Sequence, residues 1–165
     1  MGALHTACSG AERLHAPQVS EVVAAAQTLG LELHVLNAST AGDLDGVFAK
    51  LTQLRAGGLV ISSDPFFTGR SQQLAALTVH HAIPAVYAWR EFAAAGGLLS
   101  YGALITDAYR LTGIYTGRIL KGDKPSDLPV QRASKVELYI NLKTAKALGI
   151  TFPLSLLGRA DEVIE

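Results

Sequence analysis

The sequence predicts an α/β fold, a three-layer sandwich built around a mainly parallel sheet. Short apolar runs suited to buried strands alternate along the chain with stretches whose apolar residues recur at three-four spacing, as on one face of a helix. Glycines such as Gly30 and the pair at 57–58 separate these segments. The 165 residues are 49% hydrophobic and 17% charged, which is enough apolar content for one well-buried core.

The first half of the chain predicts an α/β alternation after a loose start. Residues 1–18 show no periodicity, so we expect a loose N-terminal segment followed by a single lobe over 19–165. The run at 59–62 is nearly continuous in apolar residues and predicts a central strand covered on both faces. The predicted order is a helix over 19–29, a strand over 31–36, a helix over 44–54, the strand over 59–62 and a helix over 69–80.

The stretch 83–102 is interpreted as strand, short helix and strand. The first strand, 85–87, ends in aromatic and charged residues, and the second, 98–100, ends in a serine and a tyrosine. In open α/β sheets, ligands bind just outside the carboxyl ends of the strands. Together with the turn after the strand at 59–62, these ends supply the predicted ligand-binding residues: Asp64, Phe66, Tyr87, Arg90, Glu91, Ser100 and Tyr101.

Each of these residues also has an ordinary structural interpretation. Asp64 precedes a proline and suits a turn. Arg90 and Glu91 can form a surface pair on a helix, Tyr87 can belong to the core with its hydroxyl satisfied, and Ser100 with Tyr101 can simply end a strand.

The last third predicts a helix over 105–120, a strand over 135–140, a helix over 142–148 and a short helical piece within 154–164. Apolar residues of the helix over 105–120 cover more than one stripe, so this helix needs neighbours on more than one side.

Composition and motifs exclude several classes of function. A formal net charge of zero gives no electrostatic signature for nucleic acid or an anionic membrane, and no apolar run reaches the length of about 20 residues that spans a bilayer. The single cysteine, Cys8, cannot form an internal disulfide, and the five histidines lack the spacing of a metal site. No phosphate-binding glycine motif, nucleophile elbow or acid–base pair is present, so we expect neither a cofactor nor catalysis.

Several blocks, in order, resemble the ABC-transporter substrate-binding proteins with a type I periplasmic-binding fold. They are IPAVYAWREFAAAGGLLSYG (83–102), YRLTGIYTGRILKG (109–122), KPSDLPV (124–130), INLKTAKALGI (140–150) and RADEVIE (159–165). The resemblance covers about 19–165. It implies a solute-binding component of an uptake transporter, a small and amino-acid-like solute, an ABC permease as partner and a periplasmic location.

The family has two α/β lobes, and this chain resembles the second lobe only, without the family's leader peptide. Residues 1–17 contain no signal peptide, so a cytoplasmic location stays open for this fragment. The resemblance assigns the helix at 105–122 to the other lobe. We therefore expect it to pack on a second copy of the chain, as a homodimer, or to fold back on its own lobe. With one lobe absent, water is not excluded from the ligand and we expect weak or no affinity. The alternative function is a cytoplasmic flavodoxin-like or Rossmann-like enzyme or regulatory ligand-binding domain.

Overall fold

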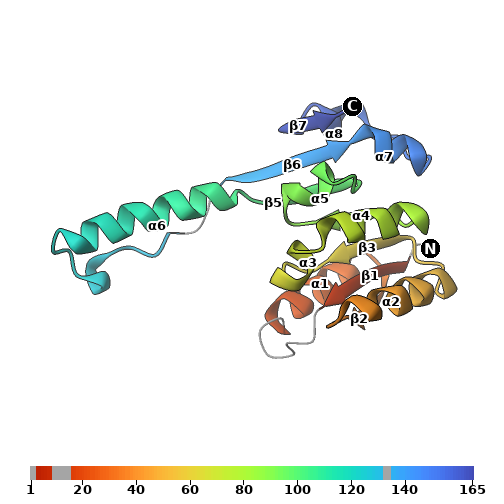
Figure 1. Ribbon diagram of the computed structural model, residues 1–165, viewed down its shortest axis with the longest axis horizontal. Coiled ribbons are helices and arrows are strands. Elements are labelled where there is room, and N and C mark those ends of the chain that lie inside the picture. The colour runs from red at the N-terminus through yellow and green to blue at the C-terminus, as the bar shows by residue number, and fades with distance from the viewer. Residues whose placement is uncertain (1–2, 9–15, 132–134) are drawn as a thin grey trace.

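The computed structural model describes residues 3–8, 16–131 and 135–165, with side chains described from residue 20 onward. Its centre is one seven-stranded sheet in the order β2-β1-β3-β4-β5-β6-β7, flanked by helices (Figure 1). The predicted α/β fold with a mainly parallel sheet is confirmed. The strands are β1 (Ala3–Cys8), β2 (Glu32–Asn37), β3 (Gly58–Ile61), β4 (Ala85–Tyr87), β5 (Leu99–Ala103), β6 (Val136–Asn141) and β7 (Glu162–Ile164).

The helices follow the strands in the alternation that the sequence predicts. They are α1 (Ala16–Thr28), α2 (Ala41–Gln53), α3 (Pro65–Thr68), α4 (Ser71–His80), α5 (Arg90–Ala94), α6 (Ile105–Leu120), the 3₁₀ turn η1 (Pro125–Asp127), α7 (Leu142–Ala147) and α8 (Leu154–Leu157). Local signals fix several ends. Thr40 is the N-cap of α2, and the Asn141 side chain accepts a hydrogen bond from the Thr144 backbone N–H at the start of α7. None of the helices described is long and apolar enough to cross a membrane.

All neighbouring strands are parallel except β5 and β6, which are antiparallel. The carboxyl ends of β3, β4 and β5 therefore meet at one edge of the sheet. Because β6 runs the other way, it begins at that same edge, where Glu137 pairs with Gly102. Four consecutive strands thus deliver side chains to one place.

The core lies between the central strands and the helices that follow them. Leu59 and Ile61 of β3 and Tyr87 of β4 are buried, as are Phe48 of α2 and Phe92 of α5. The short apolar runs of β3 and β4 suit strands that are covered on both faces. This packed core holds the loops after β3 and β4 in fixed positions.

Helix α6 projects away from the sheet, and the segment that returns from its end runs beside it (Figure 1). None of its residues is buried, and Tyr109 and Leu120 are 70% and 82% exposed. The Tyr115 hydroxyl donates a hydrogen bond to the Pro129 carbonyl oxygen, 2.6 Å away, which ties the return segment to the helix. The expectation that this helix folds back on its own lobe is therefore wrong. Packing on a second copy stays a prediction.

Two terminal predictions are corrected. In the segment 1–18, expected to be loose, residues 3–8 form β1 between β2 and β3, and α1 begins at Ala16. Residues 1–2 and 9–15 lie outside the described residues. At the other end, the helical piece within 154–164 is limited to α8, and β7 follows it. Strand β7 forms because its three residues pair in parallel with β6, and the Asp161 carboxylate accepts a hydrogen bond from the Leu138 N–H.

Candidate functional site

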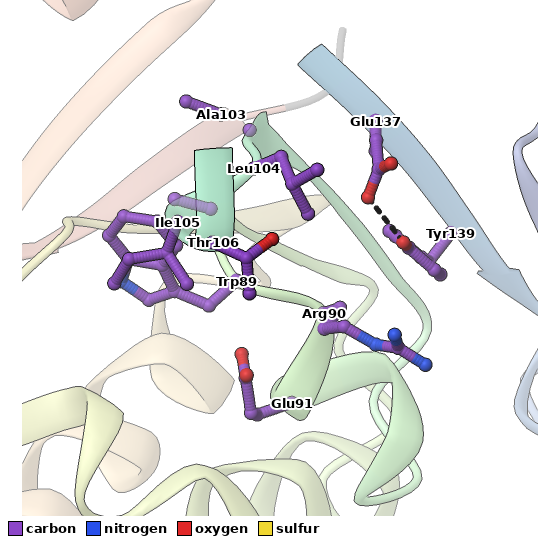
Figure 2. Close-up of a pocket in the computed structure, with 11 residues that line it drawn as sticks. Trp89, Arg90, Glu91, Ala103, Leu104, Ile105, Thr106, Glu137 and Tyr139 are labelled. Carbon is purple, nitrogen blue, oxygen red and sulfur yellow. Dashed lines mark hydrogen bonds between the residues drawn. The ribbon is translucent and has the colours of Figure 1, made fainter. Parts of the chain in front are cut away.

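A cavity of about 110 Å³ lies where β4 and β5 end and β6 begins. We call it the Glu137 cavity; its polar and aromatic lining is Trp89, Arg90, Glu91, Thr106, Glu137 and Tyr139 (Figure 2). It is lined by residues at the ends of β4 and β5, in the first turn of α6 and at the start of β6. Its position at the carboxyl ends of parallel strands is where the fold class places ligands.

A second cavity, of about 390 Å³, lies beside the loop after β3. We call it the Asp64 cavity; it is lined by Ser63, Asp64, Pro65, Thr68, Gly69, Trp89 and Ile105. Trp89 and Ile105 line both cavities, so the two are adjacent spaces separated by these side chains. Together they offer mainly apolar walls with a few polar groups, which is the usual composition of a small-molecule site.

Arg90 begins α5, three residues after the end of β4, and is held away from the cavity centre. Its guanidinium lies 3.3 Å from the Glu162 carboxylate of β7, and its guanidinium carbon is 5.0 Å from the centroid of the Tyr139 ring. The cation–π contact and the ion pair fix the side chain on the β6–β7 side of the site. Arg90 therefore connects the loop after β4 to the last two strands.

Glu137 is nearly buried at the start of β6 and has two polar partners. Its carboxylate accepts a short hydrogen bond from the Tyr139 hydroxyl, and the Lys135 ammonium lies 2.7 Å away. The Lys135 interaction, and then the tyrosine hydrogen bond, hold the pKa of Glu137 below its ordinary value. The same carboxylate stabilises the protonated phenol and raises the pKa of Tyr139 to about 12. At neutral pH Glu137 is charged and Tyr139 is neutral.

Asp64 is the N-cap of α3, and one of its carboxylate oxygens accepts a hydrogen bond from the Phe66 N–H at 2.7 Å. The Tyr87 side chain, at the end of β4, contacts this turn through its hydroxyl group. Its hydroxyl lies 2.7 Å from the Thr68 hydroxyl and donates to the Asp64 carbonyl oxygen at 3.3 Å. Burial raises the pKa of Tyr87. The end of β4 thus positions the turn that follows β3.

Three of the seven predicted ligand-binding residues line the cavities: Asp64, Arg90 and Glu91. Tyr87 and Ser100 are each 1% exposed and lie beneath the site, paired in register across β4 and β5. The Ser100 hydroxyl has no hydrogen-bond partner in the described part of the chain.

The remaining two lie outside both cavity linings. Phe66 packs edge-on against Phe67 and under the Arg70 guanidinium, and Tyr101 is 60% exposed. The ligand-binding role of all seven residues stays a prediction.

Among the lining residues that the predicted set omits are Trp89, Ile105, Glu137 and Tyr139. Trp89 comes two residues after the end of β4, so the rule that placed Arg90 at the site also applies to Trp89. The sequence signal for Glu137 and Tyr139 was weaker. Glu137 and Tyr139 alternate along a strand whose antiparallel direction is not encoded in that alternation.

A family model described as ABC transporter substrate binding protein matches residues 3–164 of the chain. The match therefore covers both cavities and every strand of the sheet. The comparison with curated proteins gave no match.

Solved structures are similar over nearly the whole chain. The ABC domain from Streptococcus pneumoniae in complex with L-Trp is 26% identical with a TM-score of 0.87, and the alignment covers 99% of this chain and 56% of that one. A conserved domain protein from Vibrio cholerae is 21% identical with a TM-score of 0.88, over 98% of this chain and 54% of that one.

The ligand-free, open structure of a substrate binding protein with adhesive properties from Clostridium difficile is 19% identical with a TM-score of 0.72. The alignment covers 99% of this chain and 54% of that one. The chain therefore spans about half the length of the solved structures it matches.

Proposed function

Because the chain belongs to the family of ABC transporter substrate binding proteins, we propose that it binds a small solute for an uptake transporter and performs no catalysis. The solute occupies the Glu137 cavity and the adjoining Asp64 cavity. An ABC permease is the proposed partner, and the periplasm the proposed location.

One observation carries this proposal. The two cavities share Trp89 and Ile105 and lie at the carboxyl ends of β3, β4 and β5. Their polar groups form ion pairs and hydrogen bonds of the kind that orient a ligand, and none forms a nucleophile–base arrangement in the part of the chain described. Binding explains this set of groups better than bond-breaking chemistry does.

An amino-acid-like solute is favoured. The similar domain from S. pneumoniae, at a TM-score of 0.87, was solved with L-Trp. In this chain Trp89 and Ile105 offer an apolar contact between the cavities, and Asp64, Glu91 and Arg90 offer charge beside it. Such a combination suits a molecule with an apolar side and a charged end.

A second folded body is proposed to cover α6, and for this chain alone that body is a second copy. Of the large apolar residues exposed on α6, Ile105, Tyr109, Ile119 and Leu120 fall within an arc of about 100° on a helix that advances about 100° per residue, and Ile114 lies outside this arc. Between them, the Thr112 and Thr116 hydroxyls donate to the carbonyl oxygens four residues earlier, each at 2.9 Å. The stripe is therefore effectively apolar, and apolar stripes of this kind mark interaction surfaces.

The test of solute binding is an NMR titration of the isotope-labelled chain with L-Trp, L-Leu, L-Lys, L-Glu and a sugar. Both cavities are open to solvent, so we expect the favoured amino acid to bind with a dissociation constant of about 1 mM, equivalent to a binding free energy of about 4 kcal/mol. The expected shifts centre on Trp89 and the residues around Asp64. Absence of any shift at about 10 mM of every solute would contradict the proposal, as would shifts confined to α7 and α8.

A genomic observation provides an independent check. A reading frame for a complementary α/β lobe, a permease or an ATPase next to the gene would support the transporter role. An operon of metabolic enzymes alone would count against it.

A further inference from the structure

Trp89, the only tryptophan of the chain, forms a wall of both cavities. It is the N-cap residue of α5, with an extended backbone, and its partly buried ring packs against the edge of the core. An indole face attracts cations through the ring quadrupole, more strongly than a phenyl ring does. The charges around Trp89 therefore decide what kind of solute this wall favours.

The one cation among the cavity-lining residues described is directed away from Trp89. Figure 2 shows the Arg90 guanidinium extending toward Tyr139, on the opposite side of the site from the indole. Its 3.3 Å ion pair with Glu162 and its position over the Tyr139 ring hold it there. Arg90 is thus poorly placed to bind an anionic group that lies against Trp89.

The acidic residues have the opposite arrangement. Asp64, Glu91 and Glu137 line the two cavities, three carboxylates against the single guanidinium. Glu137 is compensated by Lys135. The Glu91 side chain makes no hydrogen bond or ion pair within the described residues, and in Figure 2 its carboxylate is turned toward Trp89. Negative potential is therefore concentrated beside the indole.

We propose that the solute bound by this wall carries a positive charge on an apolar group, as an organic ammonium ion does. The cation lies over Trp89 next to the Glu91 carboxylate, and the apolar group contacts Ile105. This inference rests on the proposed function and specifies the solute class for the same site. A carboxylate on the solute, where one exists, is bound by groups other than those of this wall.

Three probes that share a phenyl ring test the charge preference: phenethylamine, 3-phenylpropionate and L-Phe. Binding is followed by the fluorescence of Trp89, which the phenyl probes do not obscure, and by calorimetry in parallel. We expect phenethylamine to bind about fivefold more tightly than 3-phenylpropionate, the ratio expected of one partly exposed charge pair. Glu91→Gln should remove most of this preference. Glu21→Gln, an exposed carboxylate on α1, is the matched control and should retain it.

The outcomes separate the two proposals. Equal binding of the two charged probes, or tighter binding of 3-phenylpropionate, overturns the cation preference and leaves solute binding intact. Calorimetric binding without a fluorescence change places the solute away from Trp89 and also overturns it. Absence of binding by every probe and by every solute of the NMR titration contradicts the proposed function itself, whereas absence of binding by the probes alone overturns the cation preference. The probe comparison on the unmodified chain stands even if Glu91→Gln fails to fold.

Discussion

Gly102 packs directly against Ala88, so that the end of β5 touches the loop that leaves β4. A Cβ atom built at Gly102 would lie closer than 3.0 Å to the Ala88 carbonyl oxygen, a backbone atom with little freedom to move. Both residues line the Glu137 cavity. This close approach keeps the two strand ends in contact and sets the width of the site.

Gly102→Ala should therefore destabilise the fold by about 1–3 kcal/mol, the usual cost of an overpacked site, and should weaken solute binding. The free energy of unfolding in urea measures the first effect. Gly113→Ala is the matched control because a Cβ there meets nothing within 4 Å. In the middle of α6 it should be neutral or stabilise by up to about 1 kcal/mol. Equal effects of the two substitutions would show that the Gly102 contact is unimportant.

Tyr87→Phe tests whether the end of β4 supports the turn after β3. The substitution removes the hydroxyl that contacts Thr68 at 2.7 Å and the Asp64 carbonyl at 3.3 Å, at a buried position. We expect a loss of about 1 kcal/mol in the free energy of unfolding, together with faster amide exchange over α3. Tyr101→Phe, at a 60% exposed position, should change neither. Unchanged exchange in α3 after Tyr87→Phe would contradict this supporting role.

Alkaline pH should destabilise the protein through Tyr139. The Glu137 hydrogen bond raises its pKa to about 12, above the ordinary value of 10.0. A raised pKa means that the folded state favours the protonated phenol. The contribution of Tyr139 to the free energy of unfolding is therefore fully present below pH 10 and is lost as the pH rises toward 12. The midpoint of urea unfolding should fall across this range and fall less in Tyr139→Phe. Tyr109→Phe, at a 70% exposed position, should retain the wild-type profile.

Acid should act through the other member of this pair. The pKa of Glu137 is lowered from its ordinary value of 4.5, first by Lys135 and then by Tyr139. The folded state therefore favours the charged carboxylate, whose contribution is present above pH 4.5 and is lost as the pH falls below it. Glu137→Gln should flatten the acid limb of the stability profile. If stability falls as steeply in acid for Glu137→Gln as for the wild type, other carboxylates dominate the acid sensitivity.

The sequence predicted both ends of α6 and placed most other elements to within a few residues, because their periodicity and end signals agree with their surroundings. Strand β1 was missed because Ala3–Cys8 is short of the large β-branched residues that mark strands. Pairing with both β2 and β3 stabilises this segment as a strand despite its composition. Strand β7 has three residues and depends on β6 in the same way. Pairing between distant segments is not encoded in either stretch alone.

The site was predicted to the same extent and for related reasons. The strand-end rule finds Asp64, Arg90 and Glu91, which follow parallel strands. It cannot find Glu137, because that residue reaches the same edge from the start of an antiparallel strand. The rule also does not separate a side chain on the cavity surface from one beneath it. Tyr87 ends β4, but the prediction that the next strand ends at Ser100 is wrong, because β5 runs on to Ala103 in its pairing with β6. The pleat directs both side chains into the packed interior.

The exposed stripe of α6 makes the sharpest prediction about assembly. If a second copy covers it, the chain is dimeric by light scattering at micromolar concentration. Leu120→Glu should then give a monomer, because a charge in an apolar interface loses its hydration without gaining a partner. Leu154→Glu is the matched control, since Leu154 is 85% exposed on α8 and Leu120 is 82% exposed on α6. A wild-type chain that is monomeric at all concentrations contradicts the homodimer. Dimers that survive Leu120→Glu but not Leu154→Glu would move the interface to the other end of the lobe.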